Sequence, residues 1–337
     1  MADTQAAIVI PTLHAGDELR ACLDSLLSQS FDAFHIIIVD NSGRGLARSV
    51  VPSDPRVTLI ESKTNLGFGA AINLGARHTA APFIGTLNDD AAASPQWLQC
   101  LTGALRRNPR AGMAASCVLL DATGQLDSAG MLLCADGSSK QRGHGKPAGA
   151  FPREEEALFP SGSAALYRRE LFDELGGFDD AFFLYCEDSD LGLRARWAGW
   201  SCLYVPDARV EHRYSASAGR ASRLKAYLVE RNRLRLVVKN FPAHMLWKVP
   251  FVAVSRYWAH LTSISSGEGA AAEFASSAGG PLTLAWFVLK AHLALLPALP
   301  GLLRSRRAIR AHARISAREF ASLASRFRIS PREVAAQ

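Results

Sequence analysis

The feature that most constrains the fold is a series of short apolar runs that recur along the first half of the chain. The run FHIIIVD (34–40) has four consecutive apolar residues before its terminal aspartate, as expected of a strand buried on both faces of a sheet. Three further runs of β-branched and apolar residues predict strands at 6–12, 57–62 and 82–90.

The segments between these runs have helical character. Residues 16–29 repeat leucine at the spacing of one helical face, and a second helix is expected from Asn65 to about Arg77. Ser94 and Pro95 supply a cap and a first-turn proline for a third helix. Strands that alternate with helices predict an α/β fold with a doubly wound, mostly parallel sheet.

The chain after residue 120 is less regular. Residues 121–160 are glycine-rich and mixed in charge, which predicts a hairpin and a mobile loop. A helix is expected over 187–198, strands over 202–206 and 208–213, and a basic helix over 224–241 that Pro242 ends.

Composition excludes several classes of protein. Of 337 residues, 48% are hydrophobic and 20% are charged, which argues against wholesale disorder and against a collagen-like chain. The six cysteines lack the close spacing of a zinc or thioredoxin-type site, and the first residues lack the basic start of a signal peptide. We therefore expect a cytoplasmic protein with reduced thiols.

Charge is distributed unevenly along the chain. Residues 1–208 hold 17 lysines and arginines against 25 acids, a net charge of −8, whereas residues 209–337 hold 21 against 6, a net charge of +15. An acidic front and a basic back suggest two roles. We expect a catalytic domain over 1–240 and a basic, apolar helical tail over 241–337.

The tail contains two apolar segments, 245–261 and 282–303, with tryptophan and basic residues interspersed. The first is interrupted by Lys248, Pro250 and Arg256, and a spanning helix needs about 20 predominantly apolar residues. A stable span and a buried soluble helix both stay open as alternatives. An amphipathic segment at an anionic membrane surface is favoured, which predicts a peripheral protein on the inner face of the cell membrane.

Polar residues follow three of the predicted strands. These are Pro11 and Thr12, Asp40 and Asn41, and the acidic sequence Asn88–Asp89–Asp90. Ligands in such sheets bind at the carboxyl ends of strands, so these residues are candidates for one site. Asp40 can bind a nucleoside or cap a turn, and the adjacent carboxylates can bind Mg²⁺ or Mn²⁺ or simply face solvent.

Three other motifs can carry chemistry. Glu187, Asp188 and Asp190 place three acids in one helical turn, where they either favour the helix dipole or include a general base. His212 follows a strand and is either structural or a ligand. The segment Asn65–Gly69 is a glycine-rich helix entry that can approach phosphate or sugar with its backbone.

In this order the motifs IVIPT, VDNSG, NLGFGAAIN, LNDDA, GGFDDAFFLYCEDSDLGLRA and EHR resemble those of family 2 glycosyltransferases. The resemblance covers about residues 5–240 and is closest to bacterial rhamnosyltransferases. It implies a GT-A fold and an inverting transfer from a nucleotide-diphospho-sugar to a glycan or polyprenyl-linked acceptor in cell-surface polysaccharide synthesis. dTDP-rhamnose is the favoured donor and a UDP-hexose the second.

The resemblance also implies roles for single residues. Asp188 would be the base, with Glu187 and Asp190 at the acceptor, and Asp90 and His212 would bind Mg²⁺ or Mn²⁺. The triplet reads Asn-Asp-Asp, so which of its carboxylates contacts the metal is open. The donor-binding residues would be Pro11, Thr12, Asp40, Asn65, Gly67 and Asp89.

The sequence is also compatible in part with a sugar nucleotidyltransferase and with a nucleic-acid-binding protein. A sugar nucleotidyltransferase should carry a basic residue in a glycine-rich loop after the first strand, and the sequence Pro11–Gly16 lacks one. A nucleic-acid-binding protein would explain the basic back half, but the basic residues there lie beside apolar runs rather than among stacking aromatic residues. We therefore expect no nucleic-acid partner, and the sequence gives no oligomeric state.

Overall fold

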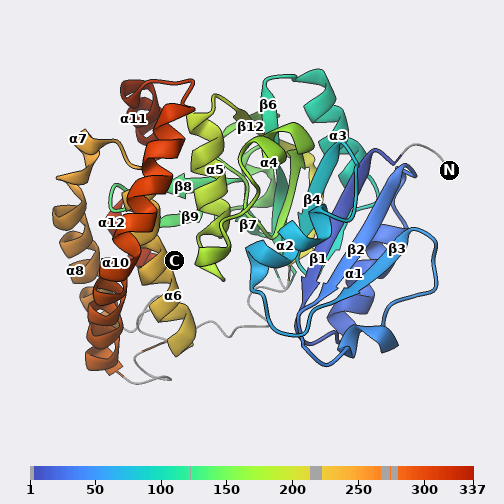
Figure 1. Cartoon of the computed structure of the whole chain (residues 1–337), viewed down its shortest axis with the longest axis horizontal. Helices are drawn as coiled ribbons and strands as arrows, with labels where there is room; N and C mark the ends of the chain where they lie inside the picture. Colours follow the sequence, from blue (N-terminus) through green and yellow to red (C-terminus); the bar gives the residue numbers. More distant parts are fainter. Residues whose placement is uncertain (1–3, 122, 213–221, 267–273, 275–279) are drawn as a thin grey trace. The chain divides into compact units, whose positions relative to one another are not determined.

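The computed structural model describes residues 4–121, 123–212, 222–266, 274 and 280–337 (Figure 1). These residues group into two compact units. The first comprises 1–131, 141–195 and 200–217, and the second comprises 132–140, 196–199 and 218–337, apart from the residues not described. Helix α6 thus groups with the tail, whereas the sequence places a domain boundary near residue 240. That boundary stays a prediction.

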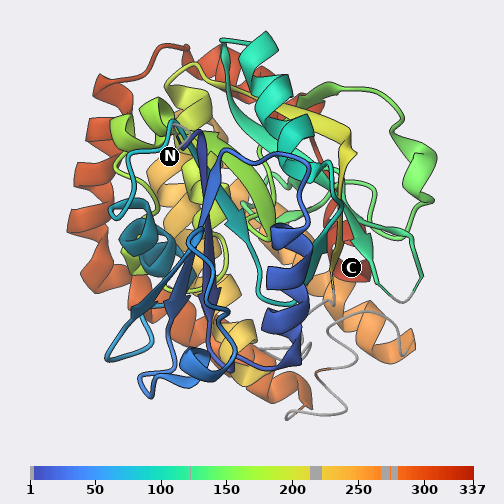
Figure 2. The same ribbon diagram turned by 90° about the vertical axis from the view of Figure 1, so that its right-hand side faces the viewer.

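The first unit is built on one mixed sheet with the strand order β10-β12-β6-β11-β4-β1-β2-β3 (Figure 2). Neighbours β3-β2-β1-β4 are all parallel, whereas β11 is antiparallel to both β4 and β6. The strands on this path are β1 (Ala6–Thr12), β2 (Phe34–Asp40), β3 (Val57–Glu61), β4 (Phe83–Leu87), β6 (Ala111–Leu120), β10 (Glu155–Ala157), β11 (Ala164–Arg168) and β12 (Ser201–His212).

Helices pack on both faces of this sheet because side chains alternate along each strand. Leu23 and Leu26 of α1 (Asp17–Leu27) join Ile8 and Ile36 in the core on one face, with α3 (Trp97–Arg107) beside them. On the other face lies α2 (Phe68–Ala76), whose Gly75 leaves no room for a β-carbon because Val9 is too close. The predicted α/β fold is therefore confirmed.

The predicted strands at 202–206 and 208–213 are one strand in the structure. β12 runs from Ser201 to His212 and pairs in parallel with β6, with a register shift between Val205 and Arg209. Pro206 cannot donate to the ladder and Asp207 is exposed, which explains the irregularity. Arg213 lies outside the described residues.

The remaining elements of the first unit are short. The strand β5 (Ala91–Ala93) pairs with β12, and β7 (Leu126–Ser128) pairs with β6. The helices are α4 (Arg169–Glu174) and α5 (Glu187–Trp197), with single turns η1 (Leu46–Ser49), η2 (Ala148–Ala150) and η3 (Asp180–Phe182). The helix expected over 187–198 is thus confirmed.

The described part of the second unit is mostly helical. β8 (Met131–Leu133) and β9 (Ser139–Gln141) form a two-stranded sheet, in agreement with the predicted hairpin. The helices are α6 (Arg223–Asn240), α7 (Ala243–Leu246), α8 (Val249–Ser266), α10 (Gly280–Ala311), α11 (Ala317–Arg326) and α12 (Pro331–Ala336). Serines 316 and 330 close capping boxes at the starts of α11 and α12.

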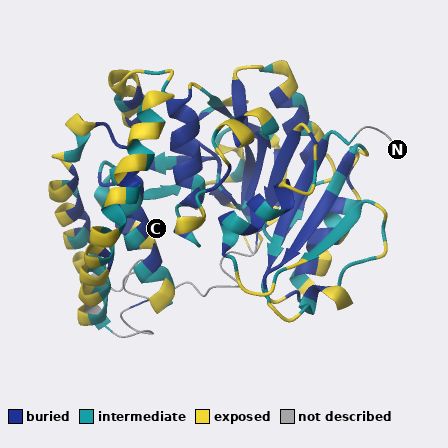
Figure 3. Ribbon diagram, in the orientation of Figure 1, coloured by how far each residue is buried: buried dark blue, intermediate teal, exposed yellow. Residues whose placement is uncertain are grey.

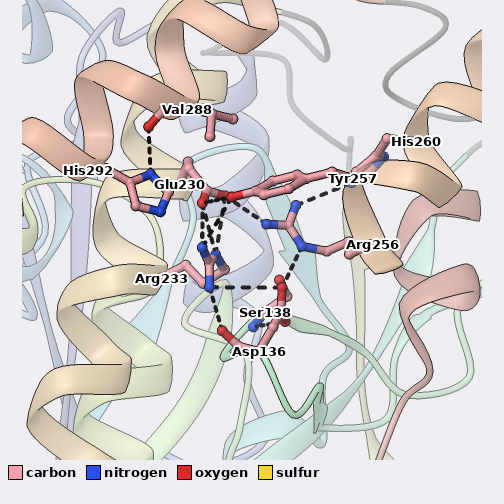
Figure 4. Close-up of polar contacts among 9 residues, drawn as sticks. All are labelled: Asp136, Ser138, Glu230, Arg233, Arg256, Tyr257, His260, Val288 and His292. Carbon is pink, nitrogen blue, oxygen red and sulfur yellow. Dashed lines mark hydrogen bonds and ion pairs between the residues drawn. The ribbon is translucent and has the colours of Figure 1, made fainter. Parts of the chain in front are cut away.

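A buried network of charges holds this unit together (Figure 4). Arg256 donates to Asp136 at 2.5 Å and to Glu230 at 2.8 Å, and Arg233 donates to Glu230 as well. Tyr257 donates to the same carboxylate at 2.5 Å. Burial opposes ionisation of both acids, but the two guanidinium groups outweigh it and lower the pKa of Asp136 and bring that of Glu230 to about 2.

Two helices of the tail have many exposed positions (Figure 3), and apolar side chains occupy a stripe along each. Each stripe repeats at alternating spacings of four and three residues, which keeps its side chains on one face. The α8 stripe is 52–70% exposed and the α10 stripe is 51–85% exposed. The α8 stripe comprises Trp247, which lies just before α8, and Phe251, Val254, Trp258 and Leu261 of that helix. The α10 stripe comprises Leu282, Trp286, Leu289, Leu293 and Leu296.

Within the described residues, Leu282–Ala311 of α10 is the one stretch long and apolar enough to cross a membrane. Only 6% of its most apolar 18-residue segment is buried. Pro297 and Pro300 lie inside the helix. The apolar character expected of this region is therefore present.

Candidate active site

The polar strand ends meet at one edge of the sheet in the first unit. β1 pairs in parallel with both β2 and β4, so the carboxyl ends of the three strands point the same way. Thr12 and Asp40 are opposite each other in the ladder, and the Thr12 hydroxyl donates to Asp89 at 2.7 Å. The predicted convergence of Thr12, Asp40 and Asp89 is what the topology produces.

Asp89 and Asp90 form an acidic pair just after β4. Burial and the neighbouring charge of Asp90 raise the pKa of Asp89 to about 6, although the hydrogen bond from Thr12 opposes the shift. Asp90 is buried, and its Oδ1 accepts no well-directed hydrogen bond from any residue that the structure describes. A carboxylate oxygen in this setting favours a cationic ligand.

His212 reaches this pair from a distant part of the sequence. It lies opposite Ala91 in the β12–β5 ladder, next to Asp90, and its Nε2 is 3.2 Å from Asp90 Oδ1. Its Nδ1 is 3.3 Å from Asp127, which the pairing of β7 with β6 brings into place. Asp127 in turn lies 3.2 Å from His144.

The charges of His212 and of the aspartates next to it stabilise one another. Burial favours neutral imidazole, but the contacts with Asp127 and Asp90 raise the pKa of His212 to about 9. Burial likewise opposes ionisation of Asp127, and the contacts with His144 and His212 lower its pKa. A metal ion bound at His212 Nε2 would have to displace the proton that this nitrogen otherwise carries.

The residues present suit a divalent cation that is shared with a ligand. Asp90 offers a buried oxygen that faces only His212 Nε2, at 3.2 Å, among the described residues, and Asp127 orients the ring of His212, as in many metal sites. No group of three or more histidine, cysteine, aspartate or glutamate side chains is arranged for metal binding among the described residues. Mg²⁺ and Mn²⁺ commonly take one or two protein ligands and complete their shell with phosphate and water.

The predicted donor-binding loops are tied to each other. Asp40 is buried and accepts hydrogen bonds from Ser42 N at 2.8 Å and Ala47 N at 2.9 Å. Burial opposes ionisation of Asp40, but these amides lower its pKa. Asn41 donates to the Gly67 carbonyl at 3.1 Å, so the turn after β2 supports the entry to α2.

Asn65 and Gly67 shape that helix entry. The Asn65 side chain accepts from Gly67 N at 2.9 Å, and Gly67 has a φ of 80° that only glycine adopts without strain. A β-carbon there would lie 2.1 Å from the Phe183 carbonyl, which accepts from Phe68 N at 2.8 Å. The glycine therefore permits a close contact between the α2 entry and the loop before α5.

The acid cluster starts α5 as expected, but its members differ. Asp188 is partly exposed and accepts from Gly162 N at 3.0 Å and Ser189 N at 2.6 Å. Burial still raises its pKa above the ordinary range, although those hydrogen bonds oppose the shift. Glu187 is buried, burial raises its pKa well above the ordinary range, and its Oε2 has no hydrogen bond among the described residues.

Asp190 lies apart from these two in its chemistry. It is fully buried and pairs with Arg194 at 2.8 Å, and the same guanidinium donates to the carbonyls of Leu175 and Gly177. This pairing indicates a structural role for Asp190. It anchors the loop that precedes α5 rather than facing an acceptor.

The loop before α5 is held in a strained form. Phe183, Tyr185 and Cys186 have positive φ angles of 64–70°, which non-glycine residues seldom adopt. Such strain costs about 1–3 kcal/mol for each residue and gathers at functional sites. Asn73 of α2 clamps the same loop, because its side chain bonds both the N–H and the carbonyl of Phe178.

Sequence reasoning missed Asp127, His144, Asn73 and Gly162. Asp127 and His144 sit in a glycine-rich region where a polar residue normally signals a solvated loop. Gly162 contributes only its backbone N–H, which no sequence pattern reveals. Asn73 is the last residue of the motif NLGFGAAIN, and an amide in the middle of an apolar helix is the signal that could have found it.

The chain is similar to known glycosyltransferases. The family model for glycosyl transferase family 2 matches residues 7–176. An N-acetylglucosaminyl-diphospho-decaprenol L-rhamnosyltransferase of Mycobacterium tuberculosis is 33% identical over 247 residues, covering 65% of this chain and 80% of the relative. The O-antigen biosynthesis protein RfbC of Myxococcus xanthus is 28% identical over 228 residues, 63% of this chain and 18% of its own.

Solved structures share the fold. A Pyrobaculum calidifontis mannosyltransferase in complex with GDP-Man and Mn²⁺ matches 93% of this chain and 86% of its own, with a TM-score of 0.54 and 18% identity. GalNAc-T7 with UDP, GalNAc and Mn²⁺ matches 70% of this chain with a TM-score of 0.57 and 16% identity. This chain spans 48% of the length of GalNAc-T7.

The family match covers half of the chain, the rhamnosyltransferase relative supports it, and the mixed sheet agrees with the GT-A fold of the structural neighbours. The chain therefore belongs to glycosyl transferase family 2, resembles rhamnosyltransferases within it, and is a glycosyltransferase.

Proposed function

We propose that this glycosyltransferase moves a sugar from a nucleotide-diphospho-sugar to a hydroxyl of a lipid-linked glycan, with inversion at the anomeric carbon. The observation that carries the proposal is Asp188, a partly exposed carboxylate fixed by Gly162 N and kept basic by its surroundings. A sugar hydroxyl is a weak nucleophile and needs such a base.

In the proposed reaction the acceptor oxygen attacks the anomeric carbon while the bond from that carbon to the donor diphosphate breaks. The acceptor proton goes to Asp188, and the nucleoside diphosphate leaves with the bonding electrons. The raised pKa of Asp188 brings its basicity nearer to neutral pH, which improves proton transfer. Glu187, next to it and buried, supports the acceptor side.

The donor would lie along the polar strand ends. Pro11, Thr12 and Asp40 would line the nucleoside pocket, and Asn65 and Gly67 would contact the nucleotide-sugar through the α2 entry. Asp89 would serve the ribose or the metal, and Asp90 and His212 would hold Mg²⁺ or Mn²⁺. When bound, the cation would neutralise charge on the leaving diphosphate.

For the donor sugar we propose rhamnose carried on dTDP, with a UDP-hexose second. The support is the rhamnosyl group in the name of the Mycobacterium tuberculosis relative. The same relative acts on a diphospho-decaprenol carrier, which supports a polyprenyl-linked acceptor here and a role in cell-surface polysaccharide synthesis.

A lipid-linked acceptor fits a protein that binds a membrane surface. The exposed stripes of α8 and α10 and the arginines after residue 303 favour a peripheral position on the inner face of the cell membrane. Lys290 and the two prolines inside α10 favour interfacial binding over a span. Extraction with carbonate should release the full chain, whereas release by detergent alone would show a span.

The transfer itself can be tested with the purified full chain. We expect dTDP-rhamnose to be used with a short polyprenyl-diphospho-GlcNAc acceptor and Mg²⁺ or Mn²⁺, with a product of inverted anomeric configuration by NMR. Titration calorimetry against both donors checks the ranking. Tighter binding and faster transfer from a UDP-hexose would overturn rhamnose, and a product of retained configuration would overturn the single displacement.

A further inference from the structure

A small basic pocket lies in the second unit, beside α7 and the start of α8. Its volume is about 210 Å³. Three of its lining residues are basic, and none of the described residues that line it is acidic. The basic residues are His244, Lys248 and Arg328, and the rest of the lining is formed mainly by small or apolar side chains such as Cys134, Met245 and Ala324.

The three basic side chains have no acidic partner among the described residues, and Lys248 Nζ lies 5.3 Å from the centroid of the Trp247 ring. All three are exposed, and no ion pair joins them to a carboxylate in the described part of the chain. Arg233 and Arg256 of the same unit are instead buried against Glu230 and Asp136. The charges of Lys248 and Arg328 are therefore not compensated by a carboxylate of the described residues.

The backbone around the pocket is well fixed. Leu133 N donates to the Phe327 carbonyl at 3.0 Å, and Ile329 N donates to the Leu133 carbonyl at 3.3 Å. These bonds hold Arg328 in an isolated bridge with the strand β8. The arginine therefore projects from an ordered segment rather than from a free end.

The pocket adjoins the α8 stripe. Trp247 lies in the chain between two lining residues, Met245 and Lys248, and stands edge to face with Phe251 at 6.4 Å. Both rings are more than 60% exposed. An aromatic stripe beside basic groups is the arrangement of proteins at the bilayer interface, where rings enter the acyl boundary and cations meet phosphates.

We propose that this pocket binds the phosphate group of an anionic phospholipid when α8 lies on the membrane. The charges of Lys248 and Arg328 and a ring N–H of His244 complement the phosphate, and the neighbouring stripe places the phosphate at headgroup depth. The inference rests on the proposed membrane association and adds a defined phosphate site to it. A defined site differs from diffuse attraction because its basic residues contribute more to membrane affinity than the same number of charges elsewhere on the surface.

The test is flotation of the full chain with vesicles at about 0.15 M salt, where diffuse attraction is largely screened. Vesicles of phosphatidylcholine alone are compared with vesicles that contain phosphatidylglycerol, and with phosphatidylcholine vesicles doped with a polyprenyl diphosphate. The double variant Lys248→Gln/Arg328→Gln removes two charges from the pocket. Arg304→Gln/Arg307→Gln, on exposed positions of α10, removes two charges outside it.

We expect the pocket variant to lose about tenfold in binding to phosphatidylglycerol vesicles, and the α10 variant to lose markedly less, because only the pocket residues meet one phosphate together. Equal losses in the two variants would overturn the site and leave diffuse attraction. Binding confined to the polyprenyl diphosphate vesicles would reject the phospholipid in favour of the carrier.

Failure of the proposed function gives a different result. If the unmodified chain binds none of the vesicles, the membrane association itself is wrong, and the pocket proposal falls with it. The variant Phe251→Ser/Trp258→Ser distinguishes membrane association from phosphate recognition. It should reduce binding to every vesicle type, while the preference for vesicles with anionic phosphate persists. Unchanged thermal unfolding of all variants shows that binding rather than folding was altered.

Discussion

Two acids of the first unit, Asp188 and Glu187, and two acids of the second, Asp136 and Glu230, have pKa shifts of opposite sign. Burial is the largest influence on each of them and favours the neutral form. At Asp188 and Glu187 no cation compensates, and the pKa values rise. At Asp136 and Glu230 arginines compensate, and the pKa values fall.

This contrast distinguishes carboxylates that can bind a proton or a ligand from carboxylates that stabilise the fold. A carboxylate without a cation is unstable in its charged form, and the fold retains it where a proton, metal or substrate is to be bound. A carboxylate between guanidinium groups has no capacity left for a ligand. The network around Glu230 therefore stabilises α6 and α8, whereas the acids around Asp188 remain without a cation, as the proposed base requires.

The largest expected effect comes from removing the base. Asp188→Asn should lower transfer by about 10²–10⁴-fold, the usual contribution of a general base, while donor binding measured by calorimetry persists. The unfolding free energy should not fall, because the burial penalty on the charge is also removed. Asp173→Asn, an exposed acid of α4, is the control. Turnover close to that of the unmodified enzyme would remove Asp188 from the mechanism.

The matching change in the second unit should act on stability instead. Glu230→Gln leaves Arg233 and Arg256 without their shared carboxylate, and breaking a buried pair in this way costs about 3–5 kcal/mol. Chemical denaturation measures the loss, and transfer per folded molecule should be unchanged. Glu61→Gln, which breaks a surface pair with Arg48, should cost about 0–1 kcal/mol. A similar cost for both variants would contradict the comparison.

A smaller effect is expected at the residue that orients His212. Asp127→Asn should weaken Mn²⁺ binding by about 10–100-fold, as changes next to metal ligands do. Excess Mn²⁺ should restore transfer in this variant but not in Asp188→Asn. Metal affinity can be followed by calorimetry without donor. Full activity of the unmodified enzyme in excess chelator would show that neither Asp90 nor His212 needs a metal.

The smallest effect is a difference between two pH profiles. Glu230 has a lowered pKa of about 2, so its contribution to stability is complete above the ordinary value of 4.5 and is lost as pH falls from there through 2. Asp188 has a raised pKa, so its base form is lost at higher pH, above the ordinary 3.8. On acidification, kcat/KM should therefore fall before the unfolding free energy does. Coincident profiles would contradict this order.

Much of the first unit follows from local sequence. The strands at 6–12 and 34–40 lie where the apolar runs predict them, since a run of Ile and Val is stable only between two layers of helices. Asp188 and Asp40 were recognisable because each follows directly on such an element or starts one. The tail could be recognised from sequence as well, because its apolar segments and its excess of basic residues do not depend on the fold.

What the sequence determined by itself is the alternation of strands and helices, and with it the edge where Thr12, Asp40 and Asp89 meet. Only the tertiary structure decided which polar residues are paired. The β12–β5 ladder brings His212 to Asp90, and a neighbouring arginine makes Asp190 structural while Asp188 stays available. The physical reason is that pairing depends on strand register and side-chain direction across distant segments, which no local pattern encodes.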